Sequence, residues 1–298
     1  MGWSAASVLA HGAASEVAPG ASWLVPDPAA LALGVAAGGL YAVGVYVQHA
    51  MGRHWSWRRT AAFGAAVAAF LYATQAGPAR YDTTLFSAHV QQHLLLGMVV
   101  GALAALGAPI TLLLQAAPRH VQTRAARLLH GRVATTLTHP VVVWLLFTGT
   151  MFVLYLTPLY ELSLRNDVLH AAVHGHFVLA GFVFFAVVLG TDPVGRRLPA
   201  GARLLMVLAT VPFHAFLGVA IITGTEPIAA EWYASVVRPT EVSILDDQRD
   251  GGALMWGGGE VLTLLAAAVI MVQWMRQDER EAARADRRRA TMGQAVQT

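Results

Sequence analysis

Histidine is the residue type that could do chemistry in this sequence, because several of its 12 histidines lie inside apolar segments. His89 and His93 form one HxxxH pair, and His170 and His174 form a second. Residues four apart lie on one face of a helix, about one turn from each other. Each pair could therefore direct two imidazoles at one metal ion. Two such pairs at matching depth in two helices predict a shared metal or proton site.

Other side chains in apolar segments extend this candidate site. His214 and Met255 lie in two further segments and could complete the ligand set or relay the ion. His176 points to a different face from His174 and is at best an outer ligand. Glu260 could ligate the ion, or it could pair with a histidine or an arginine. A histidine in a membrane can also serve only as a hydrogen-bond partner between helices, and that alternative stays open.

The absence of cysteine restricts the metal chemistry that is available. Thiolate metal sites, disulfides, haem attachment through CxxCH and cysteine catalysis are all excluded. Imidazole suits copper, zinc, iron and nickel, and thioether favours Cu(I), so the ligand types alone leave the metal open. The sequence contains neither HExxH nor GxSxG, so no catalytic nucleophile and base are visible. We therefore predict that the protein is not an enzyme.

Composition places these histidines in a membrane protein. The 298 residues are 56% hydrophobic and 12% charged, with a mean hydropathy of +0.54, whereas soluble domains contain about 25% charged residues. A membrane-spanning helix needs about 20 apolar residues. We therefore predict an all-α bundle of seven transmembrane helices, in which Gly107 and Pro109 interrupt the third and Pro212 kinks the sixth. The predicted spans are 30–48, 60–76, 85–107, 140–157, 169–190, 202–223 and 253–275.

The placement of arginine predicts the orientation of this bundle. The loops after the first, third and fifth spans and the C-terminal tail hold 16 of the 20 arginines. Basic residues concentrate in cytoplasmic loops, so we expect the N-terminus outside and the C-terminus in the cytoplasm. Arginines spread over loops also argue against nucleic-acid binding. The predicted domains are an extracytoplasmic segment 1–29, a seven-helix membrane domain 30–275 and a cytoplasmic, arginine-rich tail 276–298.

The N-terminal segment leaves one alternative open. Residues Val8-Leu9-Ala10 resemble a small-residue cleavage site, although the apolar stretch is short and no basic region precedes it. Cleavage there would make His11 an N-terminal histidine, which can bind copper through its amine and its ring. An uncleaved segment is the simpler prediction.

Three stretches of the sequence resemble the CtaG family, which are integral membrane assembly factors of cytochrome c oxidase often grouped with CopD-type copper proteins. They are SAHVQQHLLL around the first HxxxH pair, GAPITLLL after it, and DQRDGGALMW from Asp247 to Trp256. The last stretch is the most specific, and the resemblance covers roughly residues 30–275. It adds Asp247, Gln248 and Trp256 to the positions of interest.

This resemblance implies a non-enzymatic role in maturing the copper-containing subunit of a haem–copper oxidase, at its CuB centre. It therefore implies copper, as Cu(I), at the histidines, and zinc stays open. The implied partners are that subunit, an extracytoplasmic copper chaperone and the lipid membrane, and the implied location is the bacterial plasma membrane. A transporter or channel for copper or another cation would use the same histidines and is the main alternative. A haem-binding cytochrome and a purely structural scaffold also stay open, although pairs on one helix face favour a small ion over haem.

Overall fold

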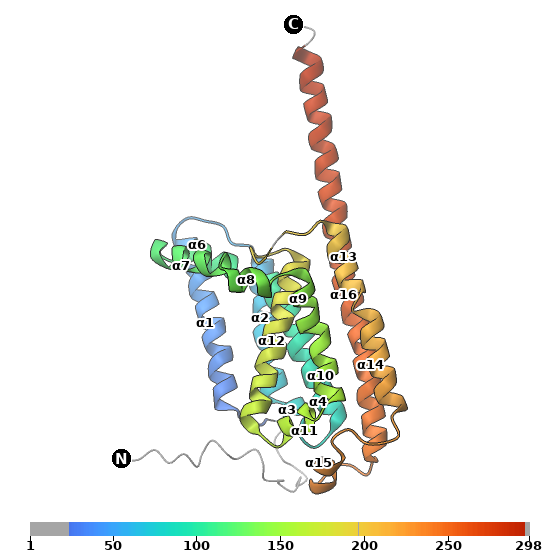
Figure 1. Cartoon of the computed structure of the whole chain (residues 1–298). Coiled ribbons are helices and arrows are strands. Elements are labelled where there is room, and N and C mark those ends of the chain that lie inside the picture. The colour runs from blue at the N-terminus through green and yellow to red at the C-terminus, as the bar shows by residue number, and fades with distance from the viewer. Residues whose placement is uncertain (1–23, 196, 296–298) are drawn as a thin grey trace, which may run out of the picture.

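The computed structural model describes residues 24–195 and 197–295, and this part of the chain is all-helical, with no strand. Each apolar segment of the sequence falls on one helix or on consecutive helices (Figure 1). The predicted all-α fold is therefore confirmed. The possible cleavage site before His11 lies outside the described residues.

The first half of the chain contains two long helices, one helix that changes type along its length, and several short helices. The helix that changes type is α4–η2–α5, in which η2 is a π-helical stretch directly after the first histidine pair. Such stretches are rare within α-helices and are frequent at functional sites. The elements are α1 (Pro28–Ala50), α2 (Trp57–Gln75), α3 (Gly77–Tyr81), α4 (Phe86–Leu94), η2 (Leu95–Val100), α5 (Gly101–Gly107), α6 (Pro109–Ala116), α7 (Arg119–Leu129) and α8 (Arg132–Leu137).

The second half contains a second helix with a π-helical stretch, η3, and ends in the longest helix of the protein, α16. α16 runs from the last apolar segment without a break into the arginine-rich tail. The elements are α9 (Pro140–Trp144), η3 (Leu145–Gly149), α10 (Thr150–Leu156), α11 (Leu159–Leu164), α12 (Asp167–Leu189), α13 (Ala200–Leu208), α14 (Val211–Thr223), α15 (Ala230–Ser235) and α16 (Ile244–Ala295).

Proline marks both of the helix breaks that the sequence predicts. α5 ends at Gly107, Ala108 adopts a left-handed φ of 50°, and Pro109 begins α6. In the predicted sixth span, α14 begins at Val211 with Pro212 in its first turn, separate from α13. A proline in the first turn of a helix removes no backbone hydrogen bond, because the N–H groups there have no partner within the helix.

Within the described residues, five helices are long and apolar enough to cross a membrane, judged by length and composition. The apolar helix Pro140–Leu156 is shorter, and the alanine-rich α2, with 19 residues, is not among the five. The chain is therefore a helical membrane protein with five candidate spanning helices, against the seven that we predict from sequence. The five are Pro28–Ala50, Phe86–Ala116, Asp167–Leu189, Ala200–Thr223 and Ile244–Arg284.

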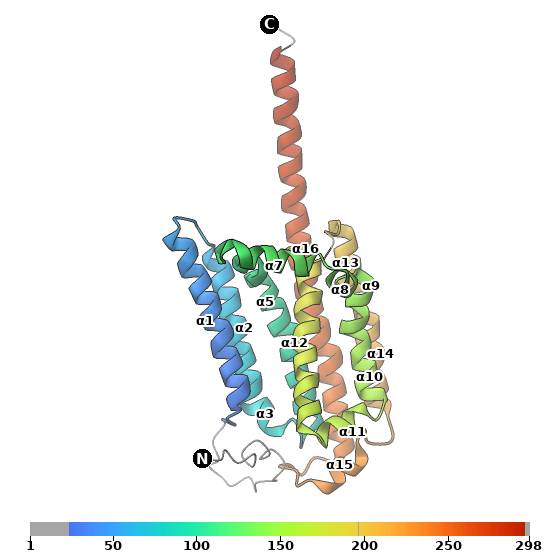
Figure 2. The same cartoon turned by 60° about the vertical axis from the view of Figure 1, so that its left-hand side comes forward.

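The helix bundle has two distinct ends (Figures 1 and 2). α7 and α8 lie across one of them, and α16 continues beyond it as a single helix; we call this the tail end. α3, α11 and α15 lie at the opposite end. α4 and α12 both begin there, so both HxxxH pairs lie near it, and we call it the histidine end.

Candidate metal centre

The two histidine pairs occupy matching positions in neighbouring helices, three and seven residues after the first residue of α4 and of α12. Each ring of α4 lies beside the ring of α12 at the same depth in the bundle. The ring centroids of His89 and His170 are 5.5 Å apart, and those of His93 and His174 are 5.3 Å apart. Within a helix the centroids are 4.0 Å apart in α4 and 4.4 Å apart in α12. The structure therefore brings all four imidazoles into one cluster.

Several ring nitrogens in this cluster are buried without a hydrogen-bond partner. His89 is fully buried, and neither of its ring nitrogens forms a hydrogen bond of good geometry; the backbone of Asp82 is a polar group close to this ring. The Nε2 atoms of His93, His170 and His174 are buried and unpaired as well. Buried polar groups are normally paired, because an unpaired one costs about 1–3 kcal/mol. A neutral imidazole has one nitrogen with a lone pair, so this group of nitrogens without hydrogen bonds is suited to ligate an ion.

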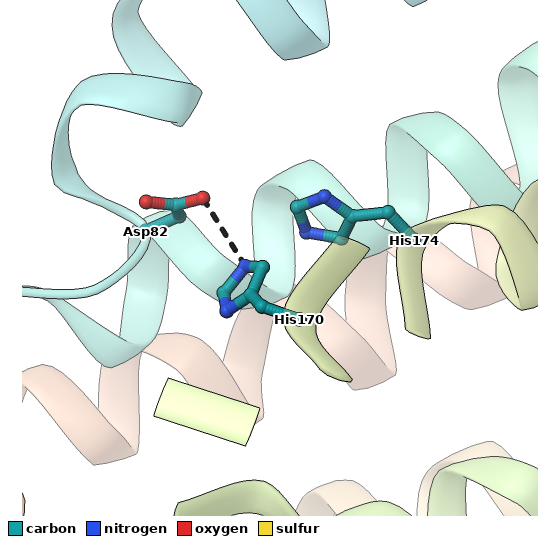
Figure 3. A group of neighbouring side chains, drawn as sticks. All are labelled: Asp82, His170 and His174. Carbon is teal, nitrogen blue, oxygen red and sulfur yellow. Dashed lines mark ion pairs between the residues drawn. The ribbon is translucent and has the colours of Figure 1, made fainter. Parts of the chain in front are cut away.

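Asp82, between α3 and α4, adds a carboxylate to the cluster. Its Oδ2 lies 3.4 Å from Nε2 of His170, without the geometry of a hydrogen bond (Figure 3). One carboxylate oxygen of Asp82 and one nitrogen each of His170 and His174 all lie within 4.8 Å of one another. In the described part of the chain, these three residues form the group with donor atoms close enough to hold one ion. His89 and His93 pack beside that group.

Buried tyrosines form the wall of the cluster on the side of α10 and α11. The hydroxyl of Tyr155 lies 3.3 Å from Nδ1 of His93. The ring of Tyr160 packs against His89 with a centroid distance of 4.7 Å, and its hydroxyl hydrogen-bonds to that of Tyr233 in α15 at 2.5 Å. Burial raises the pKa of Tyr160 and of Tyr233, so both phenols stay protonated. This wall is therefore aromatic and uncharged.

Three glycines set how closely the two histidine-bearing helices approach, and we call them the glycine seam: Gly97, Gly101 and Gly181. A Cβ on Gly181 would lie 1.9 Å from the carbonyl oxygen of Gly97, and a Cβ on Gly101 would lie 2.6 Å from the carbonyl carbon of Gly181. Small residues four apart allow such backbone contact between membrane helices. Because Gly97 follows His93 by one helical turn, the seam holds the imidazoles of α4 close to those of α12.

The DQRDGGALMW motif packs α16 against α4, the helix that carries the first histidine pair. Asp247 accepts hydrogen bonds from the backbone N–H groups of Phe86 and Ser87, at 2.8 and 3.3 Å, and from the Ser87 hydroxyl at 2.5 Å. Leu85, at the N-cap position of α4, supplies no side-chain cap. Asp247 therefore caps α4 from another helix. Arg238 forms an ion pair with the same carboxylate at 3.1 Å.

The rest of the motif fixes α16 against its other neighbours. The side chain of Gln248 accepts from the backbone of Ile228 at 2.7 Å and donates to that of Ile221 at 3.2 Å, which ties down the segment after α14. A Cβ on Gly251 would lie 2.4 Å from the Phe86 ring. Gly252 is equally crowded by α14. These contacts make the motif a positioning device for the cluster.

His214 lies on α14 and Met255 on α16, both outside the two helices that carry the histidine pairs. His214 packs beside Gly259 of α16 and has no hydrogen bond at either ring nitrogen. Its closest aromatic contact is Phe147, with a centroid distance of 6.2 Å. Met255 is fully buried within the apolar core. Among the described residues, no ring contact joins His214 to the four clustered histidines.

The two remaining sequence candidates have partners elsewhere. Nε2 of His176 lies 2.9 Å from the hydroxyl of Thr150 and 3.4 Å from the carbonyl oxygen of Leu146, so this ring faces α10 and η3. Glu260 accepts a hydrogen bond from Nε1 of Trp256 at 2.6 Å. The structure thus pairs Glu260 with an indole on its own helix instead of with a histidine or an arginine.

Sequence reasoning missed Asp82, the tyrosine wall and the glycine seam. The seam had a signal, because Gly97 and Gly101 form a GxxxG pattern in an apolar helix. Asp82 had none, since an acidic residue in a loop between helices is ordinary, and only the turn after α3 aims its carboxylate at α12. The tyrosines lie on other helices, at positions that helical spacing does not connect to the histidines.

Comparison with known proteins shows which family the chain is similar to. Residues 39–277 match the family described as cytochrome c oxidase caa3 assembly factor (Caa3_CtaG). An uncharacterized protein of Mycobacterium leprae is 36% identical over 257 residues, and one of Mycobacterium bovis is 35% identical over 254 residues. Each match covers 83% of this chain, and the chain spans 38% of the length of each relative. No solved structure matches the chain. The chain belongs to the caa3 cytochrome c oxidase assembly factor family, CtaG.

Proposed function

We propose that the protein binds copper at the histidine cluster and helps to deliver it to the CuB centre of a haem–copper oxidase. Membership of the assembly factor family supports the link to the oxidase. The observation that carries the copper proposal is the group of buried, unpaired imidazole nitrogens contributed by α4 and α12. Imidazole is a common ligand of copper, and a neutral ring binds the ion through the lone pair left free here.

We propose that the clustered side chains supply the main ligands and that Met255, buried on α16, is a candidate to complete the set or to relay the ion. Four imidazoles and one carboxylate lie together at the histidine end. We retain Cu(I) as the expected cargo and zinc as the competitor, since imidazole accepts both. His214 could serve a later step of transfer, because its unpaired nitrogens lie in the same bundle but outside the cluster.

We propose that seven helical segments cross the membrane, with α2 and α9–η3–α10 joining the five longer candidates. Four arginines lie on α7 and α8, and the arginine-rich segment of α16 extends from the same end, which favours a cytoplasmic tail end. The histidine end then faces the extracytoplasmic side, with the N-terminus. Copper would reach the cluster from that side, toward which the copper centres of the oxidase also lie.

The role that we propose is non-catalytic and is exercised in the bacterial plasma membrane. The partners are the oxidase subunit that carries CuB and an extracytoplasmic copper chaperone that loads the cluster. Copper would pass to a docked subunit by exchange of ligands. Cysteine is absent from this sequence, so these residues supply no thiolate to that exchange.

Metal content of the purified protein tests this proposal. Wild-type protein loaded with copper and then desalted should retain it, and the double variant His93→Ala/His174→Ala should retain much less. His176→Ala is the matched control, because that histidine lies on the same helix and is hydrogen-bonded to Thr150. Equal copper in wild type and the double variant would contradict the proposal.

Transport is the second candidate, and the packing below the cluster argues against it. The ring of Phe177 lies against His93 with a centroid distance of 4.3 Å. Farther toward the tail end, Phe147 and Phe184 stack at 4.2 Å, and both are buried. An ion moving through the bundle would have to pass these apolar rings, which offer no ligand of their own. Uptake of radioactive copper into proteoliposomes separates the two functions, because delivery to an oxidase predicts no uptake.

A haem-binding protein is the other alternative. A Soret band in the absorption spectrum of the purified protein would indicate it.

A further inference from the structure

Three aspartates are buried among the described residues: Asp82, Asp192 and Asp247. A buried carboxylate needs hydrogen bonds or a cation to offset the loss of its hydration. The three can therefore be compared by what surrounds each of them.

Two of these carboxylates are fully occupied by protein groups. Asp247 accepts three hydrogen bonds at the start of α4 and pairs with Arg238. Asp192 accepts three at the start of α6, from the backbone of Ile110 and from the backbone and hydroxyl of Thr111. Both are caps of helix N-termini.

Asp82 is the exception. Among the described residues its carboxylate has one ion-pair partner, Nε2 of His170 at 3.4 Å, and that nitrogen forms no hydrogen bond. The same carboxylate also lies within 4.8 Å of a donor nitrogen of His174. Figure 3 shows Asp82 reaching toward the two rings from the turn before α4. A buried acid that faces two unpaired imidazoles is the arrangement that a shared cation would complete.

We infer that Asp82, His170 and His174 form a site for a divalent transition-metal ion, Zn(II) or Cu(II), with Asp82 as a ligand. Two imidazoles and one carboxylate, with a fourth position left open, form a donor set that zinc takes in proteins. A carboxylate favours harder ions, whereas Cu(I) is selected by soft donors. Asp82 therefore adds to the affinity for a divalent ion and adds little for Cu(I).

The histidines of α4 and of α12 differ in how deeply they are buried. His89 and His93 of α4 are at most 2% exposed, whereas His170 and His174 are more exposed, at the start of α12. An ion arriving from the histidine end reaches the Asp82 side first. The inference rests on the proposed metal-binding function and adds to it a preference for oxidation state, set by one residue.

The test compares metal affinities of wild type, Asp82→Asn and the matched control Asp167→Asn, an exposed acid at the start of α12. Each full-length protein is titrated in detergent with Zn(II), with Cu(II) and, under reducing conditions, with Cu(I). We expect Asp82→Asn to weaken Zn(II) and Cu(II) binding by roughly tenfold or more, with Cu(I) binding unchanged. The control should match wild type for all three ions.

An equal loss for all three ions, or no loss for any of them, would overturn the inference. X-ray absorption by Zn(II) bound to the wild-type protein gives a second measurement that needs no variant. Two imidazoles per zinc are expected, and four would contradict a site that contains Asp82. Failure of the copper-binding function is a separate result, namely unchanged Cu(I) retention in His93→Ala/His174→Ala.

Discussion

The two ends of the helix bundle use the same device to fix a helix start. At the histidine end Asp247 accepts hydrogen bonds from two successive backbone N–H groups and a hydroxyl at the start of α4. At the tail end Asp192 does the same for α6, with Thr111 where the other end has Ser87. In each case a carboxylate from a distant part of the chain supplies the cap that the local sequence lacks.

The ends differ in what lies beside the cap. Burial raises the pKa of Asp192, and its hydrogen bonds from Ile110 and Thr111 oppose that shift. The tail-end carboxylate is therefore stabilised mainly by the helix start that it caps. The histidine-end cap adds an ion pair to Arg238 and begins the helix that carries His89 and His93. The tail-end carboxylate is satisfied by its own hydrogen bonds, whereas the histidine-end cap lies beside buried ring nitrogens that form none. Unsatisfied groups gathered beside a well-fixed helix are what a binding site requires.

The largest expected effect separates the two caps. Asp247→Ala leaves Arg238 unpaired in a buried position and leaves the start of α4 uncapped, so it should lower the free energy of unfolding by about 3–5 kcal/mol. Asp192→Ala removes hydrogen bonds but no ion pair that the structure shows, and about 1–3 kcal/mol is expected. Unfolding in mixed detergent micelles measures both values.

Copper retention sharpens this comparison further. Asp192→Ala should retain copper as wild type does, because its cap lies at the opposite end from the cluster. Asp247→Ala should retain less even at temperatures where it stays folded, since α4 would no longer hold His89 and His93 in register with α12. Equal retention by the two variants would show that the histidine-end cap does not position the cluster.

A second prediction acts on the glycine seam. Gly181→Ala places a methyl group 1.9 Å from the carbonyl oxygen of Gly97, so α12 must move away from η2. Such overpacking lowers stability by about 1–3 kcal/mol, and the same shift separates the paired imidazoles. Thermal unfolding and copper retention should therefore fall together.

Gly175→Ala is the control for the seam. It lies on the same helix, and a Cβ there meets nothing within 4 Å. Alanine is the better helix former, so this variant should be unchanged or up to about 1 kcal/mol more stable. If Gly181→Ala behaves like Gly175→Ala, the close approach of the two helices is not what holds the cluster.

The all-α class and the two helix breaks at proline were predictable from sequence, because membrane helices follow simple rules of length, hydropathy and proline placement. The seven predicted spans are not confirmed, since five helices meet those rules. The i,i+4 spacing of His89 with His93, and of His170 with His174, likewise follows from helix geometry and identified both faces correctly. Residues that act across helices were not predictable. Asp82 and Tyr155 reach the cluster through tertiary packing, which helical periodicity does not encode.

The motif from Asp247 to Trp256 shows a second limit of sequence reasoning. Its residue types are compatible with ligation, and the resemblance to CtaG marks it as important, but neither separates a ligand from a support. The contacts do so, because Asp247 is occupied by α4 and Gln248 by the segment after α14. His214 lies at a depth that suits the cluster, yet its helix packs against α16, and depth alone does not fix direction.

The smallest expected effect concerns Glu260, and it tests whether any acidic side chain in the bundle raises metal affinity. Its carboxylate accepts from the indole of Trp256 at an exposed position on α16. Glu260→Gln keeps an oxygen that can accept this bond, so stability should change by less than about 0.5 kcal/mol. Zn(II) and Cu(I) affinities should equal those of wild type, in contrast to Asp82→Asn, which removes the same charge. A loss of either affinity in Glu260→Gln would mean that negative charge anywhere in the bundle attracts the ion, and that the position of Asp82 beside His170 is not what gives it its effect.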